Sequence, residues 1–121
     1  MELLWETGRQ FVLARYVASH QQLLFRSDKG MGGGSRVEVL FGPVQNMNLS
    51  CLVYEQFNIY LLPRGDLREY SGGLFGDPPA SCKVYGIGGP EIRGLVVASG
   101  YTSVEDDGNY WERSSLLRFD S

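Results

Sequence analysis

Short runs rich in Val, Leu, Phe and Tyr recur along the chain, and Gly, Pro, Asn or Asp separate each run from the next. These runs lack the period of a helix and have the length and composition typical of strands. The strands expected from this pattern are residues 11–18, 22–27, 36–42, 44–50, 57–63, 82–87, 93–101 and 115–119. About eight strands with turn signals at this spacing predict a mainly β, single-domain antiparallel β-sandwich or partly open barrel that spans residues 1–121.

Helix is expected in few places, with at most one or two short helices in the whole chain. Asp66 followed by Glu69 resembles a capping box, and Gly72 stands where a helix would stop. This pattern favours a helix of one or two turns over residues 66–71, with a plain loop as the alternative. A Gly/Pro-rich loop that covers one end of the sheet is expected to follow. The segment 2–10 has room for another helical turn or two.

The strand expected over residues 36–42 alternates cleanly between polar and apolar side chains. Arg36 and Glu38 point to one face, and the residues on the opposite face are Val37, Val39 and Phe41. This alternation is typical of a strand with one face in the core and one face in water. Pro43 cannot donate to a sheet ladder, so a break or bulge is expected directly after this strand.

Two of the expected strands, residues 11–18 and 93–101, are apolar on both faces. Because a single exposed sheet would leave one of those faces as a bare apolar patch, the second face must meet another layer. The core of a sandwich is the ordinary outcome, and the interface of a homodimer is the alternative. The aromatic residues that fall on strands suit either form of burial.

Composition excludes several classes of function. A formal net charge of −3 gives no electrostatic reason to expect nucleic-acid binding. No window approaches the roughly 20 apolar residues of a membrane span, and Glu2 stands where a signal peptide would carry positive charge, which favours the cytoplasm. Without secretory context, Cys51 and Cys82 are expected as free, buried thiols, and two cysteines with one histidine are too few ligands for a metal site.

Neither glycine cluster fits a phosphate-binding loop. Residues 30–34 follow Lys29 and lead into a strand, whereas a Walker loop places its lysine after the glycines and opens a helix. The second cluster, residues 86–94, contains Pro90 and also leads into a strand. Both clusters are therefore expected to be hairpin loops, where glycine supplies positive φ at little steric cost. No cofactor is expected.

His20 is the only histidine, so any Ser–His or Cys–His catalytic device must use it. Its neighbour Ser19 would point to the opposite side of an extended chain, and the two would meet only in a special turn. The interpretation favoured here places His20 at a hairpin tip, where it hydrogen-bonds the turn. A small hydrolase that uses His20 is retained as a remote alternative.

The segment 104–112 combines acids and aromatics around Asp107-Gly108, a strong turn signal between two strand-like runs. A solvated hairpin tip would explain its charge. If it is instead a site, a contact patch is favoured over catalysis, since aromatics bind a protein partner and acids steer a basic one. The residues of this expected patch are Glu105, Asp106, Asp107, Tyr110 and Trp111.

The sequence therefore predicts a protein that is not an enzyme, namely a β-rich interaction module. Its expected partner is another protein or a second copy of the chain, as in an inhibitor or immunity-type bacterial protein that acts as a homodimer. The alternative is a sandwich or barrel that encloses a small apolar or sugar-like ligand, because eight strands are just enough to hold one.

Overall fold

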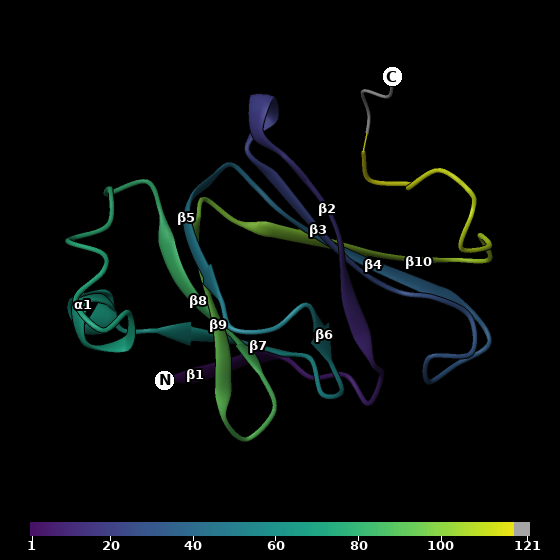
Figure 1. Ribbon diagram of the computed structural model, residues 1–121, viewed down its shortest axis with the longest axis horizontal. Coiled ribbons are helices and arrows are strands. Elements are labelled where there is room, and N and C mark those ends of the chain that lie inside the picture. Colours follow the sequence, from purple (N-terminus) through teal and green to yellow (C-terminus); the bar gives the residue numbers. More distant parts are fainter. Residues whose placement is uncertain (118–121) are drawn as a thin grey trace.

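The computed structural model describes residues 1–117, which form two antiparallel sheets of five strands each. Sheet A contains, in spatial order, β1 (Glu2–Trp5), β7 (Asn58–Leu62), β8 (Lys83–Gly88), β9 (Ile92–Ala98) and β5 (Val44–Leu49). Sheet B contains β10 (Tyr101–Asp106), β4 (Arg36–Phe41), β3 (Gln22–Ser27), β2 (Phe11–Val17) and β6 (Val53–Tyr54). The two layers are visible in Figure 1, and the expected mainly β sandwich is confirmed without closure into a barrel among the described residues.

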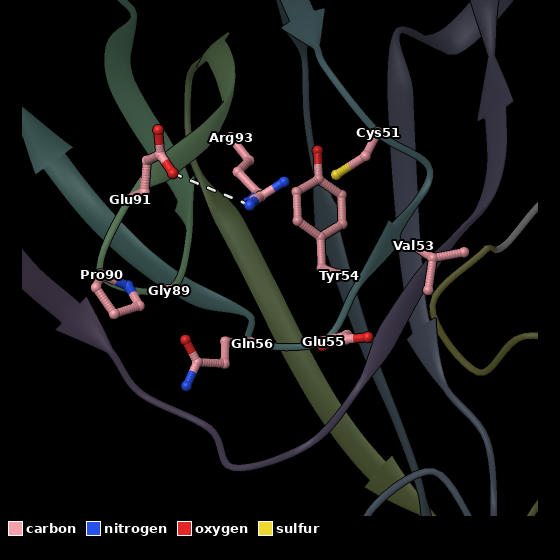
Figure 2. Close-up of a pocket in the computed structure, with 9 residues that line it drawn as sticks. All are labelled: Cys51, Val53, Tyr54, Glu55, Gln56, Gly89, Pro90, Glu91 and Arg93. Carbon is pink, nitrogen blue, oxygen red and sulfur yellow. Dashed lines mark ion pairs between the residues drawn. The ribbon is translucent and has the colours of Figure 1, made fainter.

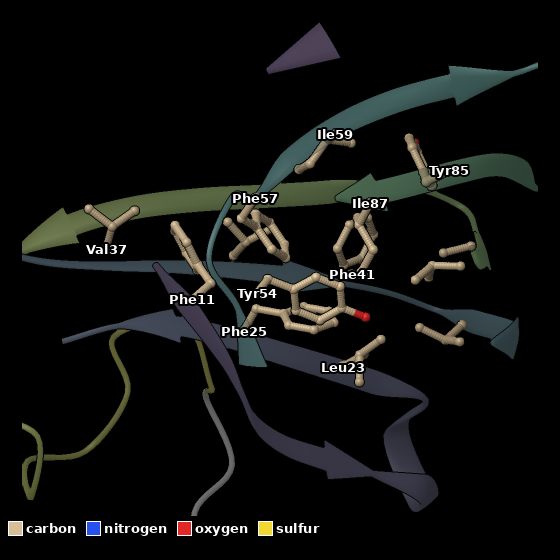
Figure 3. Close-up of a cluster of buried hydrophobic side chains, with 14 residues drawn as sticks. Phe11, Leu23, Phe25, Val37, Phe41, Tyr54, Phe57, Ile59, Tyr85 and Ile87 are labelled. Carbon is tan, nitrogen blue, oxygen red and sulfur yellow. The ribbon is translucent and has the colours of Figure 1, made fainter. Parts of the chain in front are cut away.

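The core lies between the two sheets and is dominated by aromatic rings (Figure 3). Phe57 stands at its centre, with its ring 4.5 Å from that of Phe11 and 5.0 Å from that of Phe25. The other buried members are Leu23, Val37, Val39, Phe41, Val44, Tyr54, Ile59, Tyr85, Ile87, Val96 and Ala98. The opposing sheet therefore covers one apolar face of β9, through Val96 and Ala98, whereas Leu95 and Val97 on its other face belong to a separate cluster with Leu67 of the helical segment.

The first strand corrects the expectation of helical turns in residues 2–10. The segment Glu2–Trp5 pairs with β7 as an edge strand of sheet A, and a bulge falls between Leu3 and Trp5. Trp5 packs edge-on against the rings of Phe11 and Phe57, at centroid distances of 6.0 and 6.5 Å. These tertiary contacts outweigh the weak local helix preference of so short a segment.

Two of the places where the chain passes between the sheets are sharp corners that lie together. One lies at Pro43, where the expected break is confirmed, since β4 belongs to sheet B and β5 to sheet A. The other lies at Ser99 and Gly100, where the single strand expected over residues 93–101 divides into β9 and β10. The Gly42 N–H donates to the Gly100 carbonyl at 3.1 Å, so the two corners lie side by side.

The expected helix is present as η2 (Arg64–Asp66) followed by α1 (Leu67–Tyr70), and Gly72 ends it with a φ of +66°. The Asp66 side chain makes no capping bond to this helix, so that part of the expectation is wrong. Phe75, in the loop that follows, packs against a second apolar cluster at this end of the sandwich. Its buried members are Leu62, Leu67, Cys82, Val84, Leu95 and Val97.

The strand expected over residues 115–119 is not formed in its described part, because residues 115–117 are irregular. Residues 118 and 119 lie outside the described residues. The chain after β10 instead folds back over the outer face of sheet B, which can be followed at the right of Figure 1. Residues 107–117 are called the covering segment below.

The glycine run at residues 30–34 forms the loop between β3 and β4, as expected, and it is built around Arg9. The Arg9 guanidinium donates to the Ser35 carbonyl, to the Ser35 hydroxyl at 3.1 Å and to the Ser27 hydroxyl at 3.0 Å. A Cβ at Gly33 would lie 2.9 Å from an Arg9 nitrogen. Gly32 and Gly33 therefore leave room for the side chain of Arg9, an arginine of the protein itself.

Candidate functional site

The outer face of β4 is buried, which corrects the expectation that Arg36 and Glu38 face water. Arg36 is 3% exposed and Glu38 is fully buried, because the covering segment lies across them. The polar–apolar alternation correctly assigned the side chains of β4 to two opposite faces. One face lies in the core, and the other is covered by residues 107–117. Burial of charged groups without partners is costly, so the contacts of these two side chains determine how the covering segment sits.

Arg36 holds the covering segment to sheet B. Its guanidinium forms a bidentate ion pair with Asp106, at 2.8 and 2.9 Å, a geometry among the strongest for side-chain hydrogen bonds. It also donates to the main-chain carbonyls of Asn109 at 3.4 Å, Glu112 at 3.0 Å and Arg113 at 3.1 Å. Three carbonyls on one side chain fix the backbone that carries Tyr110 and Trp111.

Glu38 holds the next part of the same segment. One carboxylate oxygen accepts two hydrogen bonds from Arg26, at 3.0 and 2.9 Å. The other oxygen accepts from the Ser114 hydroxyl and from the Ser115 N–H, each at 3.0 Å. Both oxygens of this buried carboxylate are thus fully used, and none of its capacity is left for a ligand.

The Arg36 guanidinium lowers the pKa of Asp106 far below its usual range, and bonds from Ser115 and the Gly108 N–H act in the same direction. The carboxylate is therefore stabilised in its charged form in the folded state. This stabilisation is fully present above the unfolded-state pKa of roughly 4 and is lost as the pH falls through the lowered folded-state value.

We expect Asp106→Asn to lower stability at neutral pH and to flatten the acid limb of the stability profile. The variant cannot lose a stabilising charge on acidification, so its free energy of unfolding should fall less steeply than that of the natural chain below about pH 5. Urea denaturation at a series of pH values measures both effects. Asp107→Asn is the matched control, since Asp107 is an exposed neighbour. Parallel acid limbs for Asp106→Asn and the natural chain would contradict the interpretation.

Tyr110 and Trp111 lie on the outside of this covering segment. They are 70% and 69% exposed, and their rings meet edge to face with centroids 5.0 Å apart. Beside them is an open groove of about 260 Å³, whose lining includes Leu24 of β3 and Leu117 of the covering segment. The structure thus brings the two predicted aromatic residues together as an exposed pair next to a concave surface.

The acids of the predicted patch separate into different environments. Asp106 is committed to Arg36, and Glu105 accepts a hydrogen bond from the Ser35 hydroxyl. Asp107 is exposed, as is Glu112, which accepts from the Asn109 amide at 2.8 Å. The structure therefore leaves exposed acids beside the aromatic pair but assigns Asp106 a structural contact that sequence reasoning did not separate from the others.

Ser19 and His20 meet, which corrects the expectation that they point to opposite sides. Ser19 Oγ lies 2.9 Å from His20 Nδ1 because both residues belong to η1 (Ala18–His20), which Gln21 ends at a φ of +53°. This is the special turn that such a contact requires. Both side chains are exposed at the tip of the β2–β3 hairpin, the position expected for His20.

A second concave region lies between the residues that flank β6 and the β8–β9 turn, with a volume of about 680 Å³ (Figure 2). Its polar groups include the Cys51 thiol, the Tyr54 hydroxyl and the Arg93 guanidinium, which lies 3.9 Å from the Glu91 carboxylate. The other lining residues are Val53, Glu55, Gln56, Gly89 and Pro90. No sequence pattern pointed to this region, because its residues come from segments far apart in the chain.

The cysteines are free thiols, as expected, with Cys51 partly exposed and Cys82 buried in the second apolar cluster. Among residues 1–117, no group of three or more potential ligands gathers at one metal-binding position. In the same part of the chain, no helix has the length and apolar character needed to cross a bilayer.

Comparison of the chain with protein-family models, with curated proteins and with solved structures finds no match.

Proposed function

We propose that this chain is a protein-binding module whose contact surface is the Tyr110–Trp111 pair. The observation that carries the proposal is the exposure of two adjacent aromatic side chains, each more than two-thirds in water, on a segment fixed to the sheet. Tyr and Trp are enriched among the residues that dominate binding energy at protein interfaces.

The backbone that carries Tyr110 and Trp111 is held in place, which favours a binding role for the two exposed rings. Arg36 donates hydrogen bonds to main-chain carbonyls on both sides of the pair, namely those of Asn109, Glu112 and Arg113. A partner would therefore meet side chains on an ordered backbone and would not have to order a flexible loop, which lowers the entropic cost of association.

Charge around the pair favours a partner with basic groups at its rim. Glu112 lines the groove with the two aromatic rings and Asp107 is exposed on the same covering segment, whereas the charge of Asp106 is neutralised by Arg36. Rim charges of this kind act mainly on the association rate and on its salt dependence. A second copy of the chain is the alternative occupant, because Arg15 and Arg113 lie on the same groove and would meet those acids.

The test replaces Trp111 by Ala in the full chain. We expect the affinity for proteins captured by the natural chain to fall by about 2 kcal/mol or more, which is roughly 30-fold. Calorimetry on each captured protein measures the change, and sedimentation of the chain alone reports whether a dimer becomes a monomer. Tyr70→Ala is the matched control, since Tyr70 is an exposed aromatic residue on α1.

Equal affinities and equal sedimentation for Trp111→Ala and the natural chain would overturn the proposal. No catalytic role is part of it. The exposed Ser19–His20 pair lies at a hairpin tip, and His20 lines a hollow of about 230 Å³ whose described lining residues include no acid and no cysteine. The space between the sheets, where an enclosed ligand was the alternative, is occupied by the aromatic core.

A further inference from the structure

We propose that the region around Cys51 binds small anionic disulfides and that Cys51 exchanges with them to form a mixed disulfide. This region shares no lining residue with the groove beside Tyr110 and Trp111, so the inference does not depend on the proposed protein-binding surface. Its volume of about 680 Å³ falls within the range of small-molecule sites.

The first observation is a buried hydroxyl that lacks a partner. Tyr54 is 1% exposed, and among residues 1–117 its hydroxyl makes no hydrogen bond of normal geometry, although the Cys51 thiol lies next to it. Burial raises the pKa of this phenol, and the neighbouring Cys51 thiol raises it further, so the hydroxyl remains a donor. A buried donor without an acceptor is costly, and such a group in a pocket points to an acceptor that is bound there at some stage.

The second observation is the position of a thiol and a guanidinium on either side of that hydroxyl. Figure 2 shows the Tyr54 hydroxyl between the Cys51 sulfur on one side and the Arg93 guanidinium on the other. An O–H donor beside a thiol stabilises the thiolate when the proton leaves, because the thiolate accepts the bond that the hydroxyl now lacks. The thiolate is the nucleophilic form of cysteine.

Arg93 gives the ligand its charge preference. Its side chain is 59% exposed and, among residues 1–117, its one ion pair is with the Glu91 carboxylate at 3.9 Å, where the Glu91 side chain is 82% exposed. Exposed pairs of this kind contribute little, so a ligand carboxylate can take the place of Glu91 on the guanidinium. The Glu55 carboxylate also lines the region and repels an anionic ligand. The attraction for such a ligand therefore has to come from the Arg93 guanidinium.

The exchange balances without any further reagent. Cys51 loses its thiol proton to water, and the thiolate attacks one sulfur of the disulfide. The new S–S bond joins Cys51 to that sulfur, the original S–S bond breaks, and the second sulfur leaves as a thiolate. Protonation of the leaving thiolate restores the proton count, and the ligand itself is the oxidant.

Cys82 provides a control within the same chain. It is 5% exposed and packs in the second apolar cluster with Leu62, Leu67 and Val84. An apolar, enclosed thiol is inert toward exchange. Selective reaction at Cys51 is therefore expected in the folded protein, whereas both thiols should react after unfolding.

The test uses 5,5′-dithiobis(2-nitrobenzoate) as the anionic probe and bis(2-hydroxyethyl) disulfide as the neutral probe. Intact-mass and peptide mass spectrometry of the folded chain follow adducts on each cysteine. We expect one adduct, on Cys51, and none on Cys82 while the protein is folded. Cys82→Ser should leave the rate unchanged, and Cys51→Ser should abolish the reaction.

Arg93→Gln and Tyr54→Phe separate binding from chemistry. We expect Arg93→Gln to slow the anionic probe by roughly five-fold at low ionic strength, with the neutral probe unaffected and the difference lost in high salt. Arg68→Gln, a change of another exposed arginine on α1, is the control. Tyr54→Phe should slow both probes and should not lower thermal stability, because the hydroxyl that it removes has no partner.

Labelling of Cys82 at the same rate as Cys51 in the folded chain would overturn the assignment. An equal effect of Arg93→Gln on both probes would show that Arg93 does not select for charge, and it would overturn the anionic class of ligand. An unchanged rate in Tyr54→Phe would remove the hydroxyl from the exchange. None of these results affects the measurement made on Trp111→Ala.

Discussion

Glu38→Ala should lower the free energy of unfolding by about 3–5 kcal/mol, the cost typical of breaking a buried ion pair by removing one partner. Arg26, whose side chain is 16% exposed, would lose the acceptor of two hydrogen bonds, and the Ser114 hydroxyl and Ser115 N–H would lose theirs. Urea denaturation at neutral pH measures the loss, and the covering segment should become more susceptible to proteolysis.

Two companion variants show whether the charge or the contacts matter. Glu38→Gln keeps the shape and one acceptor oxygen, so a smaller loss is expected than for Glu38→Ala. The double variant Arg26→Met, Glu38→Leu removes both charges and should recover part of the stability, since buried pairs are often replaceable by apolar groups. A loss below about 1 kcal/mol for Glu38→Ala would show that water reaches this face of sheet B.

Phe57→Ala should lower the free energy of unfolding by about 3–5 kcal/mol, because it combines lost transfer energy with a cavity in the centre of the core. The Phe57 ring is fully buried and contacts the rings of Trp5, Phe11, Phe25 and Tyr54. A cavity bordered by so many rigid rings cannot close easily, so the upper part of that range is expected.

The fluorescence of Trp5 gives a direct measurement of this effect. The chain has two tryptophans, so the Trp111→Ala background leaves Trp5 as the single reporter beside the core. Phe75→Ala is the control, since Phe75 is a partly buried residue of the second cluster and a smaller loss is expected there. A stability change for Phe57→Ala no larger than that for Phe75→Ala would contradict the central position of Phe57.

Most of the sheet architecture could be predicted because it depends on local signals. Alternation, Gly and Pro breaks and turn residues located the strands from β2 to β5 and β7 to β9. The errors fall where a partner distant in sequence decides the structure. Residues 2–5 become a strand because β7 pairs with them, and residues 93–101 divide because two sheets compete for the one segment.

Composition located the predicted patch, but it did not reveal which of its residues are exposed and which make contacts within the protein. Tyr110 and Trp111 are exposed as expected, whereas Asp106 is used by an arginine seventy residues earlier in the chain. Glu38 was assigned to water because alternation reports which face a side chain occupies and cannot report what later covers it. The surroundings of Cys51 gave no signal at all, since they assemble from residues 51–56 and 89–93.

Arg36 and Glu38 also bear on the order of events as the protein is made. Their partners Asp106, Ser114 and Ser115 are synthesised at the end of β10 or after it, and β10 is the last strand among residues 1–117. Until then, water must solvate the Arg36 guanidinium on the outer face of β4, whereas Glu38 already has Arg26 of β3 as a partner. Contacts across such long sequence separations form slowly, so the burial of Arg36 depends on a segment that is synthesised well after β3 and β4.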